Sequence, residues 1–314
     1  MRIVSLLPSA TEILFGLGFD NEIVGVSHEC DFPLRARTKT SVIQSRIPKA
    51  ISPVEIDRIV REYVSRGESL YAVDSQILQE LAPDLIITQD LCHVCAASPE
   101  DLATALGKFE KRPDVLCLNP RDLRDVWRDI LWVGEETKRS ARAEQIVGMI
   151  GERIGELEIM MDATGERPRV ALLEWLQPFY VGGHWVPEMI ERAGGIDVLG
   201  KTKTPSFRMT EEEIIAAAPD VMIVAPCGYS KEQSRDEYLS MTFSPDWENI
   251  PAVRNGRLYA MDANSYVSRP GPRLVTGMEA MAKAIHPYVR VRTGAESALL
   301  QIKPTMRNAH TATA

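Results

Sequence analysis

LQELAPDLIIT at residues 78–88 and IIAAAPDVMIV at residues 214–224 decide the fold of this 314-residue chain. In both stretches a helical pattern stops at a Pro-Asp turn, and a short, mostly apolar run follows. Proline ends a helix, and a short apolar run is typical of a parallel strand that is covered on both faces. Each stretch therefore predicts a helix, a turn and a buried strand, and the chain contains this pattern twice.

Further parts of the repeat lie on both sides of these stretches. RIVSLL at residues 2–7 precedes the first copy and RVALL at residues 169–173 precedes the second, and each is followed by a loop and a helical segment. A third strand closes each copy, at residues 115–118 and 258–261. The first copy is the longer one, and its additional residues are expected between Ser27 and Leu70. Strands that alternate with helices predict an α/β protein with two Rossmann-like lobes, each built on a central parallel sheet.

A long helix is expected between the two lobes. Residues 138–163 contain no proline, and apolar residues recur there at spacings of three and four: Ile146, Ile150, Ile154, Leu157 and Met161. A helix of this length indicates a rigid strut, so we expect only a small closure when ligand binds. The expected segments are an N-terminal lobe (1–122), a linking helical segment (123–165), a C-terminal lobe (166–290) and a flexible tail (291–314).

Composition excludes several classes of function. The net charge is −8 and no basic stripe is visible, which argues against a nucleic-acid partner. The longest apolar runs, such as residues 85–88 and 221–225, are far shorter than the ~20 residues of a membrane span, so no membrane insertion is expected. The sequence motifs of nucleotide-binding loops, α/β-hydrolases and zinc proteases are absent, which favours binding over catalysis.

Two observations bear on the compartment. The 5 cysteines are an odd number in a chain that can bury a core without disulfides, which favours a reducing environment. The pattern of the fold begins at Arg2, with no apolar signal region before it. The expectation is therefore a cytoplasmic protein, or a periplasmic one if the start codon is assigned too late.

Loops that follow parallel strands at their carboxyl ends are where open α/β sheets bind ligands. The loops expected in the second half are rich in aromatic residues and histidine: Trp175, Phe179, Tyr180, His184, Trp185 and Tyr266. Aromatic side chains at such places form walls for a large planar ligand, although each of them could equally pack in the core.

Two further clusters carry chemistry-bearing side chains. Cys92-His93-Val94-Cys95 stands between a strand and a helix start, and it allows a metal site, a thiol redox pair or a loop that shapes the ligand site. Zinc would need further ligands, for which Cys30, His28 and His184 are candidates. The run His28-Glu29-Cys30-Asp31 is equally consistent with a solvated loop.

Several motifs together resemble one family. Residues 2–18 (RIVSLLPSATEILFGLG), residues 23–33 (IVGVSHECDFP), LAPDLIITQD and the late SRPGPR resemble cobalamin-binding proteins of ABC importers. That family has the class III periplasmic-binding-protein fold, which siderophore binders share. The resemblance covers roughly residues 2–287 and implies a non-enzymatic protein that binds a corrinoid flat between two lobes.

The resemblance also assigns residues by position. It implies that the following residues line the ligand cleft: Pro8, Ser9, Thr11, Asp31, Phe32, Ser45, Arg46, Asp90, Leu91, Trp175, Tyr180 and Tyr266. It further implies that Glu100 docks on an importer permease, with Glu232 or Glu237 as the counterpart in the second lobe. His184 and Trp185 join the predicted site through the aromatic loops, and His93 and His184 are candidates for the axial face of a bound cobalt.

The sequence thus predicts the substrate-binding component of an ABC-type uptake system, or an intracellular relative of one. It is expected to be a monomer that binds a cobalamin-like corrinoid and requires no cofactor. The alternative is a metal-handling or thiol-redox protein that uses Cys92, His93 and Cys95 on the same fold.

Overall fold

The computed structural model describes residues 1–48, 51–89, 99–107 and 109–303, except for the side chains of residues 99–101. The chain forms two compact units. Unit 1 comprises residues 1–120 and 124–147, and unit 2 comprises residues 121–123 and the chain from residue 148 onward.

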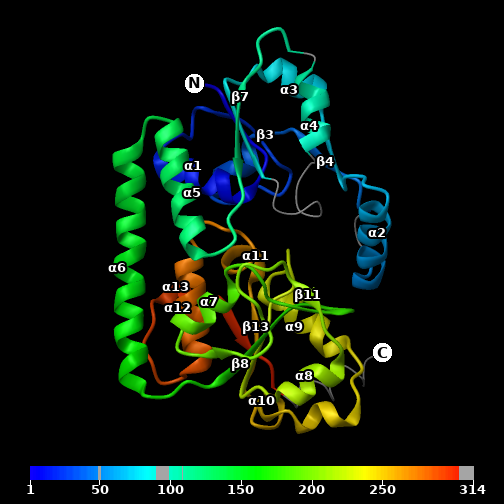
Figure 1. Ribbon diagram of the computed structural model, residues 1–314, viewed down its shortest axis with the longest axis vertical. Coiled ribbons are helices and arrows are strands. Elements are labelled where there is room, and N and C mark those ends of the chain that lie inside the picture. The colour runs from blue at the N-terminus through cyan, green and yellow to red at the C-terminus, as the bar shows by residue number, and fades with distance from the viewer. Residues whose placement is uncertain (49–50, 90–98, 108, 304–314) are drawn as a thin grey trace. The chain divides into compact units, whose positions relative to one another are not determined.

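Unit 1 is built on a parallel sheet with the strand order β3-β2-β1-β6-β7. These strands are β1 (Ile3–Ser5), β2 (Ile23–Val26), β3 (Thr40–Ser41), β6 (Leu85–Gln89) and β7 (Asp114–Leu118). A separate antiparallel pair consists of β4 (Ile43–Ser45) and β5 (Tyr71–Val73). The helices are α1 (Pro8–Leu17), α2 (Pro53–Ser65), α3 (Ser75–Leu81), α4 (Pro99–Leu106) and α5 (Leu123–Glu136), with a 3-10 turn at Leu34–Thr38. In Figure 1, α1 and α5 lie on one side of this sheet and α3 and α4 on the other.

Unit 2 is built on a mixed sheet with the order β11-β9-β8-β12-β13-β14, and β10 pairs with β8. Its strands are β8 (Arg169–Leu176), β9 (Phe179–Val181), β10 (Ile196–Asp197), β11 (Phe207–Arg208), β12 (Val221–Val224), β13 (Leu258–Met261) and β14 (Leu299–Gln301). The pairs among β8, β10, β12 and β13 are parallel, whereas β9, β11 and β14 pair antiparallel at the edges.

Seven helices of unit 2 complete the described α/β arrangement. They are α7 (Val186–Arg192), α8 (Glu211–Ala217), α9 (Lys231–Ser240), α10 (Pro251–Arg254), α11 (Ala263–Tyr266), α12 (Leu274–Ile285) and α13 (Thr293–Glu296), with a 3-10 turn at Pro245–Asn249. In Figure 1, α7 and α12 lie on one side of the sheet and α8 and α9 on the other. The predicted fold class is confirmed, because each unit has a central parallel sheet flanked by helices.

The repeat extends to individual hydrogen bonds. In unit 1, the backbone N–H of Arg2 donates to Asp84 over 2.7 Å, and its guanidinium donates to the Leu81 carbonyl over 2.8 Å. In unit 2, Arg169 makes the same two contacts, to Asp220 over 3.0 Å and to the Ala217 carbonyl over 2.7 Å. The two Pro-Asp turns therefore fix the first strand of each unit in the same way.

The helix between the two repeats is α6 (Ser140–Thr164), which agrees with the expected residues 138–163. The boundary between the units falls inside it, between Val147 and Gly148. Its first half is held in unit 1, where Arg142 donates to the Gly16 carbonyl over 3.1 Å.

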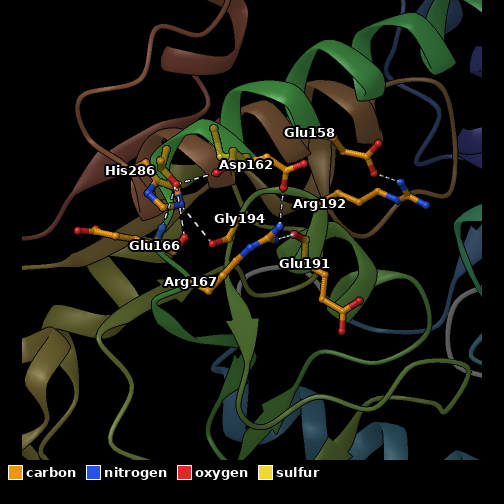
Figure 2. A network of polar contacts seen from close by, with 10 residues as sticks. Glu158, Asp162, Glu166, Arg167, Glu191, Arg192, Gly194 and His286 are labelled. Atoms are coloured by element: carbon orange, nitrogen blue, oxygen red, sulfur yellow. Dashed lines mark hydrogen bonds and ion pairs between the residues drawn. The ribbon is translucent and has the colours of Figure 1, made fainter.

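The second half of α6 is held in unit 2 by polar contacts, several of which Figure 2 shows. Arg167 donates to Asp162 over 3.1 Å and to the Glu191 carbonyl over 2.9 Å, while Glu158 pairs with Arg192. The His286 ring lies 3.2 Å from the Gly194 carbonyl oxygen and joins the end of α12 to the turn after α7.

Two expectations need correction. The segment after Leu173 was expected to be a loop, but β8 continues to Leu176 and returns as the antiparallel strand β9, which places Tyr180 opposite Trp175 and Phe179 opposite Leu176. The expected tail from residue 291 is also wrong for its described part. Residues 293–296 form α13 and residues 299–301 form β14 beside β13, which buries Ala295, Ala298 and Ile302.

Candidate functional site

The carboxyl ends of β8, β12 and β13 meet at one edge of unit 2, because these strands are parallel neighbours. We call the aromatic residues at this edge, Trp175, Tyr180, Tyr229 and Tyr266, the aromatic edge. Trp175 lies near the end of β8, and Tyr229 follows β12. Tyr266 ends α11, which directly follows β13.

The members of the aromatic edge are linked to one another. The rings of Trp175 and Tyr229 meet edge to face with centroids 5.6 Å apart, and the Trp175 indole N–H donates to the Gln177 carbonyl over 3.1 Å. The Asn264 N–H donates to the Tyr229 carbonyl over 3.3 Å, which joins the loop after β12 to α11. All four aromatic side chains are half-buried, so part of each remains accessible.

Two arginines lie on aromatic faces of this edge. Tyr180 on β9 and Arg208 on β11 are paired in register, and the Arg208 guanidinium carbon lies 5.7 Å from the Tyr180 ring centre. The Arg273 guanidinium carbon lies 5.7 Å from the Tyr266 ring centre. The aromatic edge can therefore offer both apolar faces and positive charge to a ligand.

A carboxyl group lies directly before Trp175. The Glu174 side chain accepts hydrogen bonds from the Ser206 hydroxyl and the Gly183 N–H. Burial raises the pKa of Glu174 to about 7, and the Asp197 carboxyl adds to this rise. Desolvation thus raises the pKa of this carboxyl group against its two hydrogen bonds, which favour the ionised form.

His184 occupies an unusual backbone conformation beside this carboxyl. Its φ is +50°, and its N–H donates to the Thr204 carbonyl over 2.7 Å. Its Nδ1 is buried without a hydrogen-bond partner among the described residues, and burial, with the nearby Arg121 charge, lowers the pKa of the imidazole. The ring stacks on Trp185 with centroids 5.5 Å apart. His184 thus packs on the buried Trp185, and cobalt ligation by it stays a prediction.

Two aromatic residues expected at the ligand belong to the core instead. Trp185 is 5% exposed, and its indole N–H donates to the Val267 carbonyl over 2.9 Å. Phe179 is 8% exposed and stacks on the fully buried Trp247 with centroids 5.5 Å apart. We correct the ligand-lining assignment of Trp185, and for Phe179, which the sequence left open between a ligand wall and the core, the structure shows core packing.

In unit 1 the predicted site residues after β1 are mostly internal. Ser9 is 3% exposed and Thr11 is fully buried. The Thr11 hydroxyl donates to the Ser5 hydroxyl over 2.8 Å and lies 3.1 Å from the Cys30 sulfur. We correct the assignment of Ser9 and Thr11 as ligand contacts, since both side chains are buried and that of Thr11 ties α1 to β1 and to the loop after β2. Pro8 begins α1 and is half-buried.

Other predicted residues of unit 1 lie at its surface. Phe32 is 44% exposed, and Asp31 lies 4.0 Å from Arg37. Ser45 and Arg46 are exposed at the end of β4, where Arg46 donates to the Ser69 carbonyl over 2.8 Å. These positions are compatible with ligand contact, which stays a prediction.

Several predictions lie outside the described residues: Asp90, Leu91, Cys92, His93 and Cys95. The side chain of Glu100 is likewise not described, although the residue lies in α4. His28 is exposed and its ring lies 5.4 Å from that of Tyr71. Within the described ranges, no group of three His, Cys, Asp or Glu side chains is placed to hold a metal ion. Glu232 is exposed in the first turn of α9.

Four residues of this site were missed or left unassigned by the sequence analysis: Glu174, Arg208, Tyr229 and Arg273. Glu174 was detectable as the one polar residue in the otherwise apolar run VALLEWL at residues 170–176. Arg208 could not be found from the sequence, because its place depends on pairing between β9 and β11. No helix of the described chain is both long and apolar enough to cross a membrane.

The sequence is similar to those of proteins named for binding vitamin B12 or cobalamin. The chain is 23% identical over 284 residues to a vitamin B12-binding protein of Vibrio vulnificus, covering 88% of this chain and 87% of the relative. It is 24% identical over 292 residues to a cobalamin-binding protein of Halobacterium salinarum, covering 91% of this chain and 69% of the relative.

Solved structures show the same fold. A periplasmic heme binding protein from Pseudomonas aeruginosa superposes with a TM-score of 0.71 at 20% identity, covering 95% of this chain and 96% of that one. The periplasmic vitamin B12 binding protein of Vibrio cholerae gives a TM-score of 0.66 at 19% identity, covering 90% and 96%. The family model described as periplasmic binding protein matches residues 3–265. Because this match spans most of the chain, the protein belongs to the periplasmic binding protein family.

Proposed function

We propose that this protein is the non-enzymatic solute-binding subunit of an ABC-type uptake system, and that its solute is a corrinoid of the cobalamin type. The observation that carries this proposal is the aromatic edge of unit 2. Relatives named for vitamin B12 or cobalamin support the choice of ligand.

The aromatic edge suits a macrocycle better than a small polar solute. Trp175 and Tyr229 form one corner, and Tyr180 and Tyr266 come from neighbouring segments. Rigid aromatic side chains bury a large area at low conformational cost, which favours a broad, flat ligand. A corrin ring is such a ligand, and its peripheral amides can accept and donate hydrogen bonds.

Haem is the second candidate, and one observation favours it. Arg208 and Arg273 place guanidinium groups on the faces of Tyr180 and Tyr266. Guanidinium groups pair well with carboxylates, and haem carries two propionates whereas the corrin amides are neutral. A structural relative is named as a heme binding protein.

Calorimetric titration of the protein with cobalamin, cobinamide and haem tests the proposal. A corrinoid binder takes up one cobalamin per chain with a dissociation constant in the micromolar range or below, and binds haem at least tenfold more weakly. Cobinamide lacks the nucleotide loop and so separates ring recognition from loop recognition. Tight haem binding with no heat from either corrinoid would contradict the corrinoid assignment and favour the second candidate.

Three further expectations accompany the proposal as untested predictions. Glu100 and Glu232 are expected to dock on the permease, and the protein is expected to be a monomer. The compartment is tested by fractionation of the native host, and the cytoplasmic expectation fails if the protein is recovered from the periplasm. Stoichiometric zinc without corrinoid binding would favour the alternative use of Cys92, His93 and Cys95.

A further inference from the structure

A change of register in β8 decides which side chains of this strand face away from the core of unit 2. Leu173 pairs with Val181, and both residues are fully buried. Trp175, two residues further along β8, pairs with Tyr180, which directly precedes Val181. β8 therefore has one additional residue at this point, Glu174, which forms a β-bulge. Strict alternation would place Trp175 on the same face as Leu173, so the bulge turns the Trp175 side chain to the opposite face.

The bulge is held by contacts with three other segments of unit 2. The Glu174 carboxyl group accepts from the Gly183 N–H and from the Ser206 hydroxyl. The Glu174 backbone carbonyl accepts from the Cys227 N–H over 3.1 Å. Ser206 is followed directly by β11, so the same carboxyl group also fixes the strand that carries Arg208.

One row of side chains results on this face of the sheet. Trp175 on β8, Tyr180 on β9 and Arg208 on β11 occupy paired positions of three neighbouring strands, and we call these three residues the cross-strand row. Side chains at paired antiparallel positions project to the same face. The chain neighbours Phe179 and Phe207 pack against the core on the other face. The row is about 10 Å wide, because it spans two strand spacings.

The cross-strand row changes from aromatic to cationic along its length. Trp175 and Tyr180 are half-buried, and Arg208 is exposed on β11, the edge strand of the sheet. The Arg208 guanidinium carbon lies 5.7 Å from the Tyr180 ring centre. A guanidinium group on an aromatic face keeps its N–H donors in its own plane, where two of them can bond two oxygens of one carboxylate or phosphate. The row therefore suits a ligand that is flat and carries an anionic group at its rim.

From this row we infer that Arg208 is a specificity-determining residue that binds an anionic group at the rim of the ligand, while Trp175 and Tyr180 bind the flat ring. This inference rests on the proposed function and extends it to the periphery of the ligand. In a complete corrinoid the anionic group is the phosphodiester of the nucleotide loop, and in haem it is a propionate. Both groups present two oxygen atoms to a planar guanidinium.

Calorimetric titration of the full chain with two pairs of ligands tests the inference. Cobalamin carries the phosphodiester and cobinamide lacks it, whereas haem carries charged propionates and its dimethyl ester does not. Arg208→Gln keeps a polar side chain but removes the charge, so it should bind cobalamin roughly tenfold more weakly and cobinamide with native affinity. Arg208→Lys should fall between the native protein and Arg208→Gln, because it keeps the charge but not the planar pair of donors.

Salt dependence and a matched variant separate this contact from general electrostatics. Raising the NaCl concentration from about 50 mM to about 500 mM should weaken cobalamin binding by the native protein and have little effect on Arg208→Gln. Lys201→Gln is the matched control. The Lys201 ammonium group lies 5.1 Å from the ring centre of Phe207, which packs against the core, so this variant removes the same charge near β11 without altering the cross-strand row. It should bind all four ligands with native affinity.

The outcomes separate the role of Arg208 from the proposed function. Native cobalamin affinity in Arg208→Gln, or an equal loss for cobalamin and cobinamide, overturns the role of Arg208 and leaves the corrinoid assignment standing. An equal loss in Lys201→Gln also overturns it, because any nearby charge would then suffice. If haem binds and neither corrinoid does, the corrinoid assignment fails. A loss in Arg208→Gln for haem but not for its dimethyl ester then upholds the role of Arg208, and an equal loss for both overturns it. Binding of none of the four ligands by the native protein overturns both.

Discussion

The two units share one scaffold but differ in what stands on it. In unit 1 the first strand leads into α1, where the Thr11 and Ser5 hydroxyls are bonded to each other and buried. In unit 2 the corresponding strand carries Glu174 and Trp175 near its end, and an antiparallel hairpin adds Tyr180. The Arg and Asp contacts at the base of both sheets are nevertheless the same. The comparison teaches that the repeat preserves what holds strands together, while the segments after the strands carry the chemistry.

The largest expected effect on ligand binding comes from the aromatic edge of unit 2. Replacing Trp175 and Tyr266 together by alanine should weaken cobalamin binding roughly 100- to 1000-fold, about 3–4 kcal/mol, because buried aromatic anchors dominate such surfaces. Phe32→Ala in unit 1 should weaken binding less than tenfold, since that ring is one exposed contact. Calorimetric titration measures both.

Matched controls exist for both aromatic substitutions. Tyr288 is 98% exposed in unit 2 and Trp132 is 38% exposed on α5, so Tyr288→Ala and Trp132→Ala should leave cobalamin affinity unchanged. Unchanged affinity in the Trp175/Tyr266 variant, or an equal loss in the controls, would show that the aromatic edge does not hold the ligand.

A buried acid of unit 1, Asp129, makes the stability of the protein depend on pH. Asp129 in unit 1 is 2% exposed, and neither carboxyl oxygen has a hydrogen-bond partner among the described residues. Burial raises the pKa of Asp129 from 3.8 to about 7. Between these values the native state binds more protons than the unfolded state, so stability falls as pH rises through this window and the loss is complete above pH 7.

Asp129→Asn should therefore stabilise the protein at pH 8 by about 1–3 kcal/mol and have little effect at pH 4. Urea unfolding at the two pH values measures the difference. Asp162→Asn is the control, since Asp162 is exposed and pairs with Arg167 over 3.1 Å. A gain of equal size at both pH values would mean that the charge of Asp129 is not the cause.

A smaller effect tests the shared scaffold itself. Asp84→Ala and Asp220→Ala each remove a carboxylate that accepts from the backbone N–H of the first strand. Each should destabilise the protein by about 1–2 kcal/mol, and the two losses should be similar. Asp162→Ala, which removes a solvent-exposed ion pair with Arg167, should lose less than about 0.5 kcal/mol. Clearly unequal losses at Asp84 and Asp220 would show that the two equivalent hydrogen bonds do not contribute equally to the free energy of unfolding.

Local sequence patterns were sufficient for the scaffold. Pro83 and Pro219 fixed the ends of two helices, and the apolar runs after them placed β6 and β12, because these signals act within a few residues. The same reasoning failed at β14, whose pattern has meaning only beside β13, and at the β8–β9 hairpin. Pairing between distant segments is not encoded in a short window.

The site was predicted less well for the same reason. Trp175, Tyr180 and Tyr266 were found because aromatic residues after strands are visible in the sequence. Whether such a residue faces solvent or the core depends on packing, and Trp185 and Phe179 proved to be buried. The hydrogen bonds of the Glu174 carboxyl come from Ser206 and Gly183, which belong to other segments of the chain, so the sequence around Glu174 does not reveal them.

The smallest expected effect concerns α6, whose glycines differ from one in the preceding helix. A Cβ atom on Gly148 or Gly151 would meet nothing within 4 Å, whereas one on Gly134 of α5 would lie 2.4 Å from the Ala143 Cβ. Alanine loses less backbone entropy than glycine in a helix, so Gly148→Ala and Gly151→Ala should each stabilise the protein by about 0.5–1 kcal/mol.

Gly134→Ala is the contrasting variant and should destabilise, because α5 and α6 are in contact at that position within unit 1. Thermal and urea unfolding measure all three changes. If α6 acts as a stiff strut, the two stabilising variants keep native cobalamin affinity, and small-angle scattering shows the same small change in radius of gyration on ligand binding. Reduced affinity in a more stable Gly148→Ala protein would instead mean that binding requires the helix to bend at the boundary between the units. The glycines would then be retained for motion, and the strut interpretation would be wrong.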